Sequence, residues 1–189
     1  MEPLPDTPAE PLKLVADDYW HLPEDGNRYE LLDGGPNVIA SPNRRHQRVS
    51  SRLQWHLTSC LEERGFGEVY DAPMAVILDN HSVVEPDLLY VSTERSHILA
   101  DRGIEGAPDL VIEILSPSSR RTDAHIKLKL YARTGVRHYW IADPELDRLE
   151  LYRLAGSEYE HVATFESPAV VEPEDFPGLR IPLDDVFRR

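Results

Sequence analysis

The chain has 189 residues, of which 41% are hydrophobic and 29% are charged, and its formal net charge is −14. This balance is typical of a globular protein and excludes a disordered or fibrous chain. With Cys60 as the single cysteine, an intrachain disulfide and a multi-cysteine metal site are excluded. No apolar run approaches the roughly 20 residues of a membrane span, and the first residues lack the pattern of a secretory signal. A single cytoplasmic domain, residues 1–189, is expected.

The first elements are punctuated by proline and glycine. Four prolines within residues 1–11 predict a flexible or extended arm over residues 1–12. A short helix is expected within residues 14–22. RYELL and PNVIA, which flank Asp33-Gly34, predict a β-hairpin. Apolar residues at helical spacing then predict a helix over residues 44–64, which ends at Gly65.

The second half of the chain reads mainly as strands. They are expected over residues 68–78, 83–91, 109–115, 136–142 and 148–154, with a last one near residues 159–165. A helix over residues 125–134, closed by Gly135, interrupts them. This order favours an α+β fold in which a mixed central sheet is flanked by helices, and it departs from the alternating pattern of a doubly wound fold.

The positive charges are concentrated in two segments, although the sum is strongly negative. Four arginines lie within residues 44–52, and six basic residues lie within residues 116–137 beside the single acid Asp123. Because Lys and Arg drive phosphate binding, these segments are candidate nucleic-acid contacts. Charge alone leaves open the alternative that they are solvated helix faces.

A buried-looking acid, Glu113, lies inside the apolar run DLVIEIL. A carboxylate in such a strand is costly unless it is paired or binds a metal ion. Asp109 shares its face but lies about 13 Å away along the strand, too far for one shared ion. Asp87 belongs to the preceding strand segment and can be a lateral neighbour. We therefore expect Asp87, rather than Asp109, to be the partner of Glu113.

A lysine completes the candidate site. In a D…(D/E)-x-K nuclease the lysine would stand where this sequence has Leu115. On the following helix, Lys127 falls inside the apolar stripe that contains Ile126 and Leu130, so it is aimed at the sheet. A metal site would explain a buried lysine. The alternative is a structural salt bridge between Lys127 and Glu113, and periodicity alone does not decide between the two.

At these residues the chain resembles the Uma-two family of endonucleases, a branch of the PD-(D/E)XK superfamily. Six motifs follow the family pattern in order, over about residues 29–154: RYELLDG, SPNRRHQRV, VVEPDLLYVS, GAPDLVIEILSPS, the run from Asp123 to Val136, and HYWIADP. The tail ending in PLDDVF is also similar. Each short string is unremarkable alone, but six in order are specific.

The resemblance implies a restriction-endonuclease-like core and a metal-dependent DNA endonuclease that uses Mg²⁺ or Mn²⁺. The two acids and metal ligands of the family map to Asp87 and Glu113, and its displaced lysine maps to Lys127. Glu30 and His46 also match positions that the family favours, and Glu30 is therefore a further candidate catalytic residue. For His46, the alternative is a residue on the surface of the helix. The expected DNA contacts are Arg44, His46, Arg48, Arg120 and Arg121. Because cutting two strands usually takes two active sites, a homodimer is expected.

One alternative function is favoured by two features of the sequence, and three other enzyme classes lack their motifs. A nuclease fold retained without catalysis, as a binding or oligomerisation module, is favoured by Leu115 and by the net charge of −14. A zinc hydrolase is disfavoured because the eight histidines include no H-x-x-x-H pair. A serine hydrolase and a phosphate-loop enzyme are disfavoured because G-x-S-x-G and a Gly-rich phosphate loop are both missing.

Overall fold

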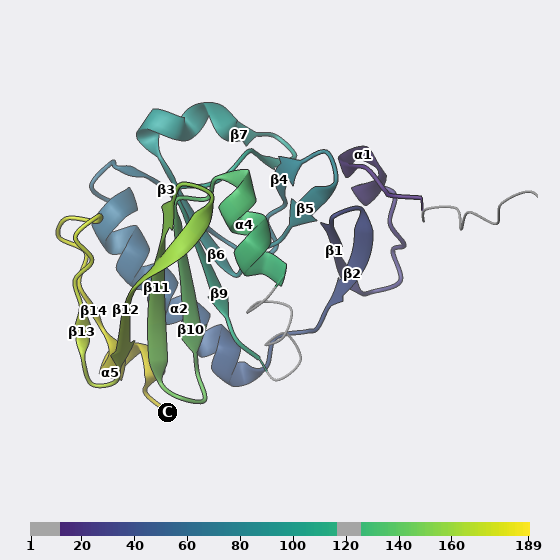
Figure 1. Cartoon of the computed structure of the whole chain (residues 1–189). Coiled ribbons are helices and arrows are strands. Elements are labelled where there is room, and N and C mark those ends of the chain that lie inside the picture. Colours follow the sequence, from purple (N-terminus) through teal and green to yellow (C-terminus); the bar gives the residue numbers. More distant parts are fainter. Residues whose placement is uncertain (1–11, 117–125) are drawn as a thin grey trace, which may run out of the picture.

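The computed structural model describes residues 12–116 and 126–189, whose strands form two six-stranded sheets and one two-stranded sheet (Figure 1). The main sheet contains, in spatial order, β12 (Glu158–Glu166), β11 (Arg148–Ala155), β10 (His138–Asp143), β9 (Leu110–Ile114), β6 (Leu88–Ser92) and β3 (Gly67–Asp71). The second sheet contains β2 (Gly35–Ile39), β1 (Arg28–Leu32), β5 (Ser82–Val84), β4 (Val76–Asp79), β8 (Gly103–Glu105) and β7 (Leu99–Ala100). Strands β13 (Val170–Val171) and β14 (Ile181–Pro182) form the small sheet.

The centre of the main sheet is covered on both faces. Strand β9 is parallel to β10 and antiparallel to β6, and all five of its residues are buried. This agrees with the apolar sequence of β9, because a strand covered on both faces does not alternate with polar residues. Strand β9 carries Glu113, so the acid lies in the interior, as the sequence predicts.

Different helices cover the two faces (Figure 1). On one face, α2 (Arg44–Leu57), its continuation as a π-helical turn (Thr58–Glu62) and α5 (Leu183–Phe187) pack against the sheet, where Leu53 contacts the cluster that contains Ile112 and Trp140. On the other face, α4 (Leu128–Thr134) and the second sheet form a separate cluster that includes Leu115 and Tyr131. A mixed sheet flanked by helices is therefore confirmed.

The predicted N-terminal hairpin is present as β1 and β2, and Asp33 and Gly34 in its turn have the positive φ angles that such a turn requires. It is not a separate appendage: β1 pairs with β5, which makes the hairpin one edge of the second sheet. The expected continuous strands over residues 68–78 and 83–91 are each divided between the two sheets, as β3 and β4 and as β5 and β6. Pro73 and Pro86 lie at the two breaks, where a residue without an N–H cannot continue a ladder.

The remaining elements are short. Helix α1 (Ala16–Tyr19) lies within the predicted helical segment, and a 3₁₀ helix (Thr93–Ile98) occupies a segment for which no element was predicted. The predicted arm, except for the exposed Leu12, and His125 of the predicted helix lie outside the described residues. None of the helices within residues 12–116 and 126–189 has the length and apolar character needed to cross a membrane.

Candidate active site

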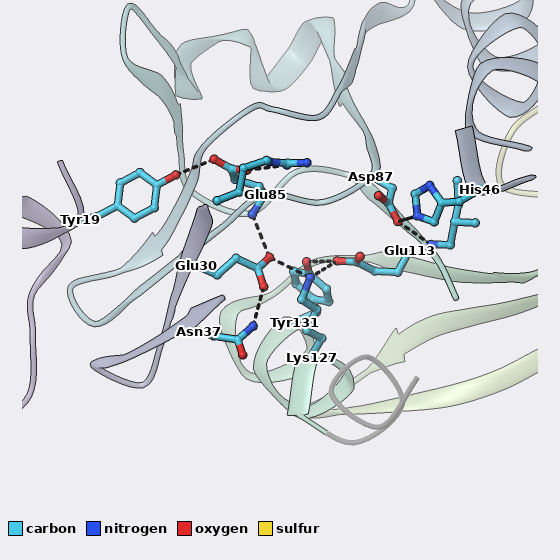
Figure 2. A network of polar contacts seen from close by, with 11 residues as sticks. Tyr19, Glu30, Asn37, His46, Glu85, Asp87, Glu113, Lys127 and Tyr131 are labelled. Atoms are coloured by element: carbon cyan, nitrogen blue, oxygen red, sulfur yellow. Dashed lines mark hydrogen bonds and ion pairs between the residues drawn. The ribbon is translucent and has the colours of Figure 1, made fainter. Parts of the chain in front are cut away.

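A cavity of about 160 Å³ lies where the two sheets meet, and acidic and basic side chains from both sheets and two helices line it. The ionisable residues in its wall are Arg28, Glu30, His46, Glu85, Asp87, Glu113 and Lys127. The crossing segment between β5 and β6 passes along this cavity, so the division of the predicted strand 83–91 between two sheets places Glu85 and Asp87 here. Figure 2 shows how these side chains converge.

Glu113 receives two hydrogen bonds from one face of the helix that covers it. Lys127 Nζ lies 2.9 Å from Glu113 Oε1, and the Tyr131 hydroxyl donates to the same oxygen at 2.7 Å (Figure 2). Lys127 stands at the N-terminal end of α4 and Tyr131 follows four residues later, so both side chains project from the same side of the helix. All three residues are at most 4% exposed. The buried lysine that the helical periodicity predicts is therefore confirmed.

Lys127 is shared by a second buried acid from the other sheet. Its Nζ lies 2.8 Å from Glu30 Oε1, and Glu30 is only 1% exposed. The backbone N–H of Glu85 donates to the same oxygen at 3.0 Å, and Asn37, the cross-strand partner of Glu30 in the hairpin, contacts Oε2 at 3.4 Å. Two carboxylates thus flank one ammonium group in the interior. Because burying a charge is costly unless it is paired, the two carboxylates and the Lys127 ammonium group depend on one another.

Tyr131 is held in its protonated form. Complete burial, followed by the nearby Glu113 and Glu30 carboxylates, raises the pKa of the Tyr131 hydroxyl well above its usual value. Ionisation would place a third negative charge beside two carboxylates, on a side chain that is fully buried. The Tyr131 hydroxyl is therefore a fixed donor that restrains Glu113.

Asp87 lies beside Glu113 at the end of the neighbouring strand. Leu88 of β6 pairs with Ile112 of β9, and continuing this antiparallel register sets Asp87 opposite Glu113. The Ile114 N–H donates to Asp87 Oδ2 at 2.8 Å, and His46 Nε2 from α2 lies 3.1 Å from the same oxygen. Both contacts involve Oδ2, and within residues 12–116 and 126–189 no hydrogen bond to Oδ1 is present. The second oxygen of Asp87 is therefore accessible to a ligand in the cavity.

The donor set fits Mg²⁺ better than it fits zinc. Over the described ranges, no group of three His, Cys, Asp or Glu side chains is arranged to hold a metal ion. Asp87 and Glu113 nevertheless line the same cavity, as does Ile114, whose N–H donates to Asp87. Mg²⁺ is usually bound through one or two carboxylates and keeps several waters, so two acids and a carbonyl oxygen meet its preference.

Of the other candidate residues in the described part of the chain, some line the cavity and others lie away from it. Asp109 lies near the opposite end of β9, where its carboxylate accepts a hydrogen bond from the Ser92 N–H, so it is not part of the cavity. His46 is 9% exposed and lines the cavity, so the alternative of a surface helix residue is wrong. Arg44 and Arg48 are exposed on α2 outside the cavity, and Arg120 and Arg121 lie outside the described residues.

Three contributors to the site are missing from the sequence predictions: Tyr131, Asn37 and Glu85. Tyr131 could have been found from its position four residues after Lys127. Asn37 could have been found from the hairpin register, which sets it opposite Glu30. The backbone N–H of Glu85 carries no signal in the sequence, because its role depends on the crossing between the two sheets.

Comparisons with known proteins agree with this architecture. A crystal structure described as that of "a putative nuclease belonging to DUF820" from Anabaena variabilis ATCC 29413 superposes with a TM-score of 0.76 over 94% of this chain and 98% of that chain, at 22% sequence identity. At this identity the likeness shows a shared fold. The search of curated proteins found no match. The family model described as "Putative restriction endonuclease" matches residues 16–184, and the chain therefore belongs to this family, Uma2.

Proposed function

We propose that this protein is a metal-dependent endonuclease that hydrolyses DNA phosphodiester bonds, with Asp87 and Glu113 as the ligands of Mg²⁺ or Mn²⁺. The observation that carries the proposal is the meeting of Asp87, Glu113 and Lys127 at one cavity, in a chain that belongs to a restriction-endonuclease family. Three elements distant in sequence supply these side chains. A fold has no structural need for such an arrangement, because apolar residues of similar volume pack at lower cost.

Each residue has a distinct task in this proposal. Asp87, Glu113 and the Ile114 carbonyl would hold the cation, which when bound supplies a water of lowered pKa and stabilises charge on the phosphate. His46 and the Ile114 N–H fix one oxygen of Asp87 and so orient the other. Lys127 carries the positive charge that positions the attacking water or neutralises the transition state. Glu30 pairs with Lys127 and so holds the ammonium group in position.

DNA is the proposed substrate, and its phosphates would be contacted by Arg44, His46, Arg48, Arg120 and Arg121. Hydrolysis of both strands of a duplex usually takes two active sites, which makes a homodimer part of the proposal. Light scattering of the purified protein tests the dimer independently of activity.

Incubation with supercoiled plasmid tests the proposed activity. With Mg²⁺ or Mn²⁺ the wild-type protein should convert the plasmid to open-circular or linear forms, and EDTA should prevent this. Asp87→Ala should be inactive, because one of the two cation ligands is lost. Unchanged plasmid with both metals, or equal cutting by Asp87→Ala, would contradict the proposal.

A second candidate is a nuclease fold without catalysis. Two observations favour it: Leu115 packs in the apolar cluster where the superfamily has its lysine, and Lys127 is already bonded to two acids. In that case the protein should show no Mg²⁺-dependent rise in melting temperature, whereas a cation that binds only the folded state raises it.

A further inference from the structure

A groove with six arginines and no acid in its wall lies between α2 and α5. The six are Arg44, Arg45, Arg48, Arg52, Arg188 and Arg189. The chain as a whole has 34 acidic and 20 basic residues, so a group of six arginines without an acid is unusual for this composition. The net charge of −14 repels polyanions, and this groove offers them a local site of positive charge.

The arginines of α2 lie close enough along the helix for their charges to repel one another. Arg44, Arg48 and Arg52 follow at four-residue intervals on one side of the helix, a spacing at which like charges destabilise a helix. Burial, together with the charges of Arg48 and Arg188, lowers the pKa of Arg52. Such a cluster is unfavourable in the free protein, and a bound anion relieves the repulsion.

Protein groups compensate this charge only in part. Arg45 pairs with Asp147, and Arg188 lies 3.5 Å from Asp185. Arg44, Arg48 and Arg189 form no ion pair with any residue in the described part of the chain. Arg52 donates from Nη1 to the carbonyl oxygens of Val186 and Arg188, whereas its buried Nη2 has no partner within that same part. Arg52 therefore also fastens α5 to α2, while Arg44 and Arg48 have no comparable structural task.

We propose that this arginine groove binds phosphates of the DNA backbone. The inference rests on the proposed function and extends the DNA contact to Arg45, Arg52, Arg188 and Arg189. His46, which lines the acidic cavity, lies in the same turn of α2 as Arg44 and Arg45, so one helix contributes to both the cavity and the groove. From Arg44 to Arg52 the helix rises about 12 Å, the axial length of roughly three to four nucleotides of one strand.

The test compares two double variants that remove the same charge. Arg44→Ala/Arg48→Ala removes two exposed groove arginines, and Arg102→Ala/Arg180→Ala removes two exposed arginines elsewhere. Binding to a fluorescent duplex is measured by anisotropy in EDTA, over a series of salt concentrations. Because each neutralised phosphate contributes about 0.9 to the slope of log K against log[salt], the groove variant should lose about 1.8 from that slope. Its affinity should fall about tenfold or more, while the control variant should bind like wild type.

A second readout uses inorganic phosphate and no DNA. Phosphate should raise the melting temperature of the wild type and of the control variant more than that of the groove variant, which shows at the same time that the variant folds. An unchanged salt slope in the groove variant, or a wild type that does not bind DNA at all, would overturn the inference.

Plasmid cutting separates this inference from the proposed function. If the wild type binds the duplex with the expected slope but never cuts with Mg²⁺ or Mn²⁺, the groove stands and the nuclease proposal fails. If it cuts while the groove variant binds and cuts equally well, the nuclease proposal stands and the groove fails.

Discussion

The two ends of strand β9 bury acids in different ways. Asp109, just before the strand, is 6% exposed and accepts a hydrogen bond from the Ser92 N–H at 2.8 Å. Glu113, near the other end, is 3% exposed and contacts Lys127 and Tyr131, with Glu30 and Asp87 close by. The cavity at the Asp109 end has about 500 Å³, against about 160 Å³ at the Glu113 end. Cavity size alone would therefore select the end that lacks the proposed site.

The two acids differ in how many partners their burial requires. The Asp109 carboxylate accepts a hydrogen bond from one backbone N–H, that of Ser92 in the adjacent strand, and this is a simple structural role. At the Glu113 end, β1, β9 and α4 each contribute a buried charge. Buried ion pairs are seldom more stable than apolar residues of the same volume, so the fold gains little from this cluster. Chemistry at the Glu113 end accounts for it better than stability does.

The largest expected effect comes from Lys127→Met. This change leaves Glu30 and Glu113 buried without their cation, so the free energy of unfolding should fall by about 3–5 kcal/mol, and cutting should be lost. Adding Glu30→Gln should restore part of the stability and none of the activity. Urea unfolding at pH 7 measures the stability. A loss below about 1 kcal/mol in the single variant would show that the two acids do not depend on Lys127.

A pair of matched substitutions compares the two ends of β9 directly. Glu113→Gln should reduce plasmid cutting on the order of 100-fold or more, because it removes a proposed cation ligand while keeping the shape of the side chain. Asp109→Asn should cut at the wild-type rate and lose only about 1–3 kcal/mol of stability. Equal loss of cutting in both variants would remove the distinction between the two ends.

Tyr131→Phe should have a smaller effect. The loss of one hydrogen bond to Glu113 should cost about 1 kcal/mol of stability and reduce cutting about tenfold or less. Because the pKa of Tyr131 lies well above its usual value, its hydroxyl stays protonated across the working range. The ratio of wild-type to variant rates should therefore be constant from pH 6 to about pH 9. A ratio that falls as the pH rises would mean that Tyr131 ionises.

The smallest effect concerns His138, beside Asp109. Burial is the main cause that lowers the pKa of His138 below 6.5, and the Asp175 carboxylate opposes the shift. As the pH falls below about 6.5, the unfolded state takes up this proton before the folded state does, so stability is lost. His138→Gln should remove that part of the pH dependence while cutting at neutral pH continues. Identical melting curves against pH for wild type and variant would contradict the assignment.

The sequence predicts much of the fold because the signals are local. The apolar run of β9, the turn at Asp33-Gly34 and the helical spacing in α2 each report their own element. The divided strands are not predictable in this way, since Pro73 and Pro86 mark a break but do not say that the chain passes to another sheet. The second sheet is therefore a result of packing that periodicity does not reveal.

The residues of the candidate site likewise fall into those with a local sequence signal and those that depend on packing. Lys127 is predictable, because a lysine inside an apolar stripe must face the interior. The convergence of Lys127 with Glu30 is not, because it depends on how the hairpin docks against α4. The burial of His46 is likewise hidden, since a polar sequence around it is equally consistent with an exposed helix turn.

Asp87 and Glu113 are proposed to bind one divalent cation together, and a crystal soaked in Mn²⁺ examines this pair itself. An anomalous density peak is expected between the two carboxylates, at about 2.1 Å from an oxygen of each, and no such peak is expected in a Glu113→Gln crystal. A soaked crystal that binds Mn²⁺ elsewhere, with the Asp87–Glu113 gap empty, would contradict it.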